Sequence, residues 1–204
     1  MTAADPQTRA ITPKILYYGM PVILITTRNE DHTTNISPIS SSFALGDNIV
    51  LGISTSSKAY DNLTLHPECV INLPSAPLWE NVERIAPYTG RTVVPEFKEA
   101  MGFTHEKNKF AAGGFTPVDS EVVQPSRISE CPLQIEAQVQ RMTVPEYDPF
   151  FAIVETRAVQ VHAHSDILIG EHHIDPRRWN PLIYNFRHYF GLGDPLGATF
   201  RSET

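Results

Sequence analysis

Residues 35–63 read NISPISSSFALGDNIVLGISTSSKAYDNL, and this stretch carries the first information about the fold. The runs ISSSFAL and NIVLGIS meet at Gly46-Asp47-Asn48, which has the composition of a β-hairpin turn. Ser56 or Ser57 can then cap a helix that runs through KAYDNLTLH and ends before Pro67. The stretch therefore predicts a strand, a tight turn, a second strand and a capped helix.

Segments on both sides of this unit predict further strands. PVILITT (residues 21–27) is a nearly continuous apolar run rich in β-branched residues, and CVINLP (69–74) ends at a proline. LQIEAQVQ (133–140) alternates apolar and polar residues, as expected of a half-buried antiparallel strand. FFAIVETRAVQVHAH (150–164) predicts a long strand with a kink or bulge near its middle.

Helices are predicted to be few and short. The 17 prolines are spread along the chain, and a proline inside a helix costs about 3 kcal/mol. One further helix is predicted in VPEFKEAMG (94–102), with Pro95 in its first turn and Gly102 at its end. A parallel sheet would need longer, alternating helices, so the sequence predicts a mainly β protein with a closed or split antiparallel barrel.

Composition restricts the classes of function. The 204 residues carry a formal net charge of −7 without a basic tract, which argues against binding nucleic acid or an anionic membrane. The N-terminus lacks the pattern of a signal peptide, and no apolar run reaches the roughly 20 residues that span a bilayer. Cys69 and Cys131 are expected to be reduced core residues. We expect a soluble, cytoplasmic globular protein.

Several catalytic and metal motifs are absent from the sequence. The glycines of GLGDPLG (191–197) do not have GxGxxG spacing, and neither a phosphate-binding P-loop motif nor GxSxG occurs. His162 and His164 would share one face of a strand, and His172 and His173 follow, as candidate ligands for a first-row metal. No cysteine or carboxylate spacing completes that set, so we predict no metal site.

The hydroxyls before Lys58 are the main candidates for ligand binding. If residues 54–57 end a strand, the unpaired N–H groups of the following helix point outward at the positive end of its dipole. Thr55, Ser56 and Ser57 would add hydroxyls and Lys58 an ammonium, which together make a phosphate-sized anion site. The alternative is ordinary helix capping by a single serine.

The segment NISPISSS (35–42) can provide the other half of such a site. Pro38 has no N–H to donate and restricts Ser37 to extended geometry, so the strand is an edge or is broken there. Its free backbone groups could then face a flat heteroaromatic ligand. An irregular edge strand without a ligand is the alternative.

In this order, NISPISSSFAL, NIVLGISTSSKAYDNL and ECVINLPS resemble the flavin reductase-like family of FMN-binding split barrels. The C-terminal PLIYNFRHYFGLG is similar to the flavoredoxin-type branch of that family. The resemblance covers about residues 15–193, leaving tails at 1–14 and 194–204. It implies a six-stranded antiparallel Greek-key barrel with a few short helices, which forms a homodimer and binds FMN near the subunit interface.

The resemblance also implies a set of FMN contacts. The isoalloxazine ring would lie along Asn35, Ser37, Pro38, Ser40, Ser41 and Ser42. The phosphate would be held by Thr55, Ser56, Ser57 and Lys58, with Asn62 nearby, and the segment from Asn72 to Ser75 would border the ring or the ribityl chain. His188 and Tyr189 would close the site, from the same subunit or its partner. Residues 89–110 fit the family pattern only loosely, so Arg91 and Lys109 are not assigned as contacts.

The implied activity is that of an NAD(P)H-dependent flavin reductase, in which NADH or NADPH passes a hydride to FMN. The flavin performs the redox step, while the protein aligns the rings and directs N–H donors of residues 40–42 at the growing negative charge. His188 and Tyr189 are the catalytic candidates on the nicotinamide side, although they could instead pack a dimer. The reduced flavin could serve a partner monooxygenase or another acceptor. The alternatives are an electron-transfer flavoprotein that keeps FMN tightly bound, and a non-catalytic FMN-binding protein.

Overall fold

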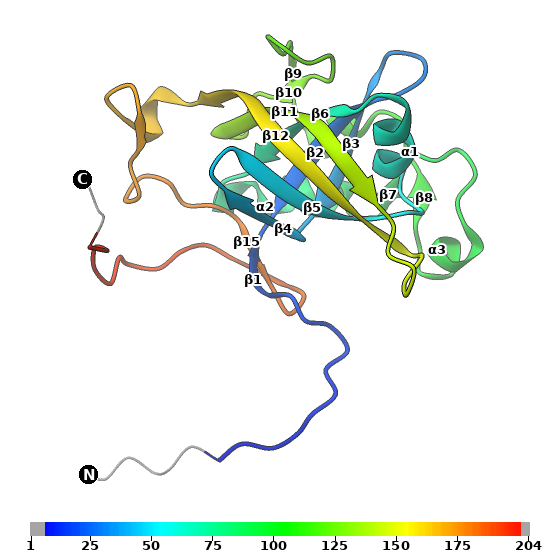
Figure 1. Cartoon of the computed structure of the whole chain (residues 1–204), viewed down its shortest axis with the longest axis horizontal. Coiled ribbons are helices and arrows are strands. Elements are labelled where there is room, and N and C mark those ends of the chain that lie inside the picture. The colour runs from blue at the N-terminus through cyan, green and yellow to red at the C-terminus, as the bar shows by residue number, and fades with distance from the viewer. Residues whose placement is uncertain (1–6, 201–204) are drawn as a thin grey trace.

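A curled antiparallel sheet forms the body of the protein, and the computed structural model describes residues 7–200 (Figure 1). The predicted tails lie partly outside the described residues. All neighbouring strands of the sheet are antiparallel, which confirms the expected mainly β class. The strand order is β3 (Thr34–Ile39), β2 (Ile23–Arg28), β6 (Glu68–Leu73), β11 (Leu133–Thr143), β12 (Phe151–Ala163), β5 (Asn48–Ser54) and β4 (Ser42–Leu45).

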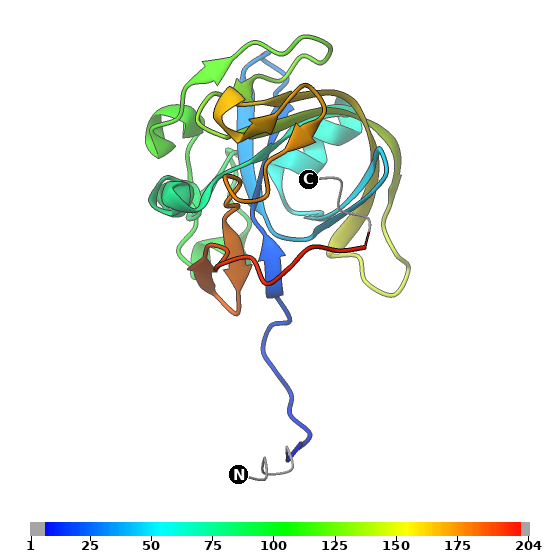
Figure 2. The ribbon, with the colours of Figure 1, turned by 90° about the vertical axis from the view of Figure 1, so that its left-hand side faces the viewer.

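The two edges of this sheet, β3 and β4, follow each other directly in the chain. Only Ser40 and Ser41 separate them, yet β3 pairs with β2 and β4 pairs with β5. A single strand broken at Ser40 and Ser41 therefore changes partners and draws the two edges together, so the sheet curls into a split barrel (Figure 2). Counting β3 and β4 as one broken strand reconciles the six predicted strands with the seven of the sheet.

The predicted hairpin and the predicted bulge are both present. β4 and β5 are joined by Gly46 and Asp47, and Gly46 has the left-handed φ of 63° that tight hairpin turns need. In the long strand β12, Gln160 pairs with Glu136 and Ala158 with Ala137, so Val159 is an extra, bulged residue.

Short helices pack against the barrel. The helix α1 (Lys58–Leu65) starts after Ser57, whose Oγ accepts a hydrogen bond of 3.1 Å from the backbone N–H of Tyr60, as predicted. The helix α3 (Glu96–Ala100) is shorter than expected, because Pro95 precedes its first turn instead of lying within it. Two helices were not predicted: α2 (Trp79–Ile85) and α4 (Lys109–Gly113). Within residues 7–200 no helix is long and apolar enough to cross a membrane.

Small secondary elements surround the main sheet. Three strands form a separate sheet in the order β1 (Tyr18–Pro21), β15 (Ile183–Asn185) and β16 (His188–Phe190). The paired short strands are β7 (Tyr88–Thr89) with β8 (Thr104–His105), β9 (Pro117–Val118) with β10 (Arg127–Ile128), and β13 (Leu168–Ile169) with β14 (His173–Ile174). The 3₁₀ turns are η1 (Ala76–Leu78) and η2 (Ser165–Ile167).

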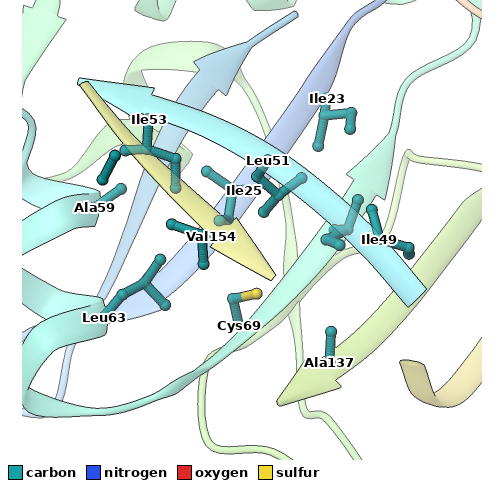
Figure 3. Packing of buried hydrophobic residues seen from close by; sticks show 12 residues of the cluster. Ile23, Ile25, Ile49, Leu51, Ile53, Ala59, Leu63, Cys69, Ala137 and Val154 are labelled. Carbon is teal, nitrogen blue, oxygen red and sulfur yellow. The ribbon is translucent and has the colours of Figure 1, made fainter. Parts of the chain in front are cut away.

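Strand β2 is buried on both faces, which accounts for its continuous apolar sequence. Ile23 and Ile25 point into the barrel, where they pack against residues of β5, β6 and α1 (Figure 3). Leu24 packs on the other side, in a second cluster with Val82 of α2 and Phe110 of α4. Cys69 lies in the first cluster and Cys131 in the second; both are free thiols, as predicted, and burial raises the pKa of the Cys69 thiol to about 12.

The polar face of β11 departs from the expectation of a half-buried strand. Gln134 and Glu136 are almost fully buried, because the loop before and through β10 covers them. The carboxylate of Glu136 accepts hydrogen bonds of 2.6–3.0 Å from three consecutive backbone N–H groups, at residues 121–123. Burial opposes ionisation of Glu136, but these donors and His162 together outweigh it and lower its pKa. The loop is thus fixed to the sheet by one buried charge.

Candidate functional site

A cavity of about 270 Å³ lies between β3, the start of α1 and the chain from α2 to α4. We call it the cationic compartment, because three lysines and none of the acidic residues that the structure describes line it. Its polar lining consists of Ser37, Ser54, Ser57, Lys58, Tyr88, Thr89, Lys98 and Lys109. The chain has only five lysines and a net charge of −7, yet three of the five lysines line this one cavity, which makes its lining chemically suited to an anion.

Lys58 reaches this compartment from the first turn of α1. Its side chain is only 14% exposed, and its Nζ donates to both carboxylate oxygens of Glu30, at 2.7 and 3.0 Å. The hydrogen bond with Lys58 lowers the pKa of Glu30. Ser57, the capping residue, lies on the same wall.

Lys109 is the most deeply placed of the three lysines, with 2% of its surface exposed. Its Nζ donates to the carbonyl oxygen of Ile36 on β3, at 2.8 Å. Burial lowers the pKa of Lys109 to about 8, and the nearby charge of Lys98 acts in the same direction. A buried ammonium with one neutral partner is favourably placed to receive a negative group.

Lys98 and Phe103 enter the compartment from the segment between α2 and α4. The Nζ of Lys98 donates to the carbonyl oxygen of Ser56 at 3.0 Å and lies 5.8 Å from the centre of the Phe103 ring. Burial lowers the pKa of Lys98, and the charge of Arg91 adds to that effect. Arg91 itself is fully engaged, since it forms a two-pronged ion pair with Asp61.

Asn35 and Gly90 meet beside the compartment. Asn35 is buried and donates from Nδ2 to Ser37 Oγ at 3.0 Å, whereas its Oδ1 has no hydrogen-bond partner among the described residues. A methyl group on Gly90 would overlap this Oδ1 and come within 3.0 Å of Lys58 Cγ. Glycine is therefore required for the close approach of the two segments.

A larger cavity of about 610 Å³ adjoins the first, and we call it the aromatic compartment. The two share a largely apolar wall that includes Pro38, Ile39, Ala86 and Phe103. The far wall is made by Tyr17, Tyr184, Arg187 and Tyr189, and the ring centres of Tyr184 and Tyr189 are 5.8 Å apart. The hydroxyl of Tyr189 donates to Glu83 at 2.9 Å, and burial together with that carboxylate raises its pKa.

The structure brings together part of the predicted site. Ser37, Pro38, Ser57 and Lys58 line the cationic compartment, with Asn35 directly behind them. Ser40 and Tyr189 line the aromatic compartment. Segments far apart in the sequence thus converge on these two adjoining compartments, which together we call the groove.

Other predicted contacts lie elsewhere. Thr55 Oγ1 donates to the carbonyl of Pro149, and Ser56 Oγ shares a hydrogen bond with Ser54 Oγ, at 2.8 Å each. Asn62 is buried where α1 packs against β2, and its Nδ2 donates hydrogen bonds to Thr27 Oγ1 and Asn29 Oδ1. None of these three predicted side chains lines the groove.

Four further predicted positions also lie outside the groove. Asn72 is buried in the sheet, bonded to backbone groups such as the carbonyl of Leu24 and the N–H of Ile128. Ser41 and Ser42 line a separate cavity on the outer side of β4 and β5, and His188 lines a cavity beside Trp79.

The histidines of the long strand hold structural positions. His162 Nε2 donates to Glu136 Oε1 at 2.7 Å, and His164 Nε2 donates to the carbonyl of Ser129 at 2.9 Å. Within residues 7–200, no three His, Cys, Asp or Glu side chains are grouped so that they could hold a metal ion.

The sequence matches the flavin reductase like domain family over residues 16–193, and the chain therefore belongs to that family. It is 58% identical over 196 residues to the uncharacterised protein YdfE of Bacillus subtilis (strain 168), covering 96% of this chain and 95% of the relative. Family membership supports a flavin-related redox role.

Solved structures share the fold at low identity. Flavoredoxin of Desulfovibrio vulgaris (Miyazaki F) superimposes with a TM-score of 0.78 and 19% identity, covering 97% of this chain and all (100%) of that one. Nitrilotriacetate monooxygenase component B from Bacillus cereus gives a TM-score of 0.73 and 16% identity, covering 95% and 100%. These likenesses confirm the split-barrel architecture.

Proposed function

We propose that this protein is an NAD(P)H-dependent flavin reductase that binds FMN in the groove. The observation that carries the proposal is the junction of a compartment with three lysines and no acidic lining residue, among those described, with a compartment walled by aromatic rings. The cationic compartment suits a phosphate monoester, and the aromatic compartment suits flat rings.

The residues present fit FMN. The ammonium groups of Lys58 and Lys98, with the capped start of α1, would hold the phosphate. The apolar wall shared by the compartments, including Pro38 and Phe103, would contact the flat ring. Asn35, behind this lining, would position Ser37 through its hydrogen bond to Ser37 Oγ.

Bound FMN would supply the hydride-accepting chemistry, and the side chains of the protein would orient the bound molecules and stabilise the negative charge that develops on the ring. Lys109, held in place by the carbonyl of Ile36, would direct its ammonium at negative charge on a reduced ring. Tyr189 would orient the nicotinamide and, with its pKa raised, keep its phenol proton at neutral pH. His188, which lines the neighbouring cavity, would act only indirectly within one chain.

We also propose that the outer side of β4 and β5 is a homodimer interface. A cavity of about 720 Å³ lies there, and its lining includes Tyr18 and Phe43, which are 72% and 63% exposed. Apolar patches of this kind mark association surfaces. Light scattering should give a dimer mass for the wild type and a monomer mass for Phe43→Asp; a wild-type monomer would refute the interface.

The visible absorption spectrum of the purified protein, followed by anaerobic addition of NADH and then NADPH, tests the proposed function. Flavin absorbance that bleaches on adding one nucleotide supports a reductase. Flavin that remains bound through extensive dialysis and is reduced only by a protein donor would instead favour an electron carrier of the flavoredoxin kind. A reductase with exchangeable FMN would be able to supply a partner monooxygenase. No flavin uptake at all would refute the proposal.

A further inference from the structure

The hairpin between β15 and β16 has an unusual turn. Asn185 pairs with His188, so Phe186 and Arg187 are its two turn residues, with φ values of 44° and 68°. Consecutive left-handed conformations are typical of Asn-Gly turns and cost free energy in bulky residues. The hairpin alone does not require this pair, since Asn and Gly would form the same turn with less strain. Strain of this kind is concentrated at functional sites.

The turn holds Arg187 at the wall of the aromatic compartment, next to Tyr189. In the part of the chain that the structure describes, the guanidinium group of Arg187 has no ion-pair or hydrogen-bond partner. Arg187 is also the only cationic residue, among those described, that lines the compartment. Its acidic counterpart there, Glu83, already accepts the hydroxyl proton of Tyr189 at 2.9 Å.

The other arginines that could bind an anionic nucleotide are unsuitable. Arg91 is engaged by Asp61 at 2.6 and 2.7 Å. Arg28 contacts His32 at the opposite end of β2, and Arg177 and Arg178 follow β14, so none of these three lines either compartment.

We propose that Arg187 binds a phosphate group of the nicotinamide nucleotide and so determines the affinity for the electron donor. This inference rests on the proposed function, in which the lysine compartment is taken by the phosphate of FMN. A second phosphorylated molecule in the groove needs a second cation, and a guanidinium matches phosphate with two parallel hydrogen bonds. The strained turn keeps that cation directed at the second molecule.

Steady-state kinetics of Arg187→Ala with four donors test the inference. The donors are NADH, NADPH, reduced nicotinamide mononucleotide and the phosphate-free 1-benzyl-1,4-dihydronicotinamide. We expect KM to rise about tenfold for phosphorylated donors, the loss of one charge-assisted contact, with kcat little changed. The phosphate-free donor should be unaffected. A rise for NADPH alone would assign the contact to the 2′-phosphate, and a rise for all three to the phosphate next to the nicotinamide ribose.

Controls separate the guanidinium from the turn. Phe186→Asn keeps the left-handed turn geometry at a lower strain and keeps Arg187, and Arg177→Ala removes an exposed arginine outside the groove, so both should keep the wild-type KM. Arg187→Gly should raise Tm while it raises KM, and Arg187→Lys should restore part of the affinity. An unchanged KM in Arg187→Ala, or an equal rise with the phosphate-free donor or in Phe186→Asn, would overturn the inference. A wild type that binds flavin but oxidises none of the donors would refute the proposed function instead.

Discussion

The ammonium of Lys58 lies 2.7 Å from one carboxylate oxygen of Glu30 and 3.0 Å from the other, so the lysine at the start of α1 is already paired before any ligand binds. A phosphate would have to compete with Glu30, which is 60% exposed. Glu30→Gln should therefore tighten FMN binding about threefold, the scale of a solvent-exposed ion pair. Flavin fluorescence titrations would measure this, with riboflavin as the phosphate-free reference. An equal gain for riboflavin would show that Glu30 does not compete with phosphate.

Removing the lysine should have the opposite effect. Lys58→Ala should weaken FMN binding about 10- to 100-fold, because a charge-assisted hydrogen bond to phosphate is lost, and leave riboflavin binding nearly unchanged. Lys14→Ala, which removes an equal charge outside both compartments, is the matched control. Equal weakening of both flavins would contradict the phosphate assignment.

Gly90 is a second sensitive position. Gly90→Ala would force Asn35 and the stem of Lys58 apart, at a cost of about 1–3 kcal/mol for overpacking, and should weaken the binding of both FMN and riboflavin about 5- to 150-fold. Gly193→Ala, where an added methyl meets nothing within 4 Å, should bind as the wild type does. Calorimetric flavin binding checks both variants, and normal affinity in Gly90→Ala would show that the approach of Asn35 to Gly90 is not needed.

The lowered pKa of Lys109, about 8, predicts a pH dependence of flavin binding. A negative ligand group favours the protonated lysine, so the affinity should be full below pH 8 and fall as the pH rises above it. Lys98 and Glu106 also influence the titration of Lys109, so the pH profile of the wild type is compared with that of Lys109→Gln. The variant should bind flavin more weakly, and its affinity should not change around pH 8. Titrations from pH 6.5 to 9.5 would test this; identical pH profiles would exclude Lys109 as the titrating group.

The buried Glu136 predicts an effect on stability instead of binding. Glu136→Gln should destabilise the fold by about 2–4 kcal/mol, because an amide cannot satisfy three N–H donors and His162 as a carboxylate does. Since its pKa is lowered, its contribution is present above the ordinary glutamate pKa and is lost as the pH falls through the folded value. The Tm difference between wild type and variant should therefore shrink in acid. A constant difference would contradict a role for the charge.

Local chemistry made much of the barrel predictable. The turn at Gly46, the serine cap of α1 and the missing donor of Pro38 depend only on neighbouring residues, and all three have the expected effect. The resemblance to the family added the closure of the sheet, which no local pattern carries.

Long-range contacts limited the prediction of the site. The sequence identifies Ser57 and Lys58, but only the tertiary structure brings Lys98 and Lys109 against them, from a segment that fits the family loosely. The scarcity of lysine in an acidic chain was the available signal for both. Conversely, Thr55 looked equivalent to Ser57, yet its hydroxyl is taken by the carbonyl of Pro149 on a distant loop. Glu136 looked like a solvent-facing residue because its covering loop lies outside its strand.

The break in the strand between β3 and β4 has a mechanical consequence. Ser40, at this break, lines both the groove and the outer cavity, whereas Ser41 lines only the outer cavity, so the two cavities meet at one residue of the broken strand. A subunit bound at the outer cavity and a ligand bound in the groove would both contact Ser40. Dimer formation and ligand binding would then influence each other directly, without a change passing through the hydrophobic core.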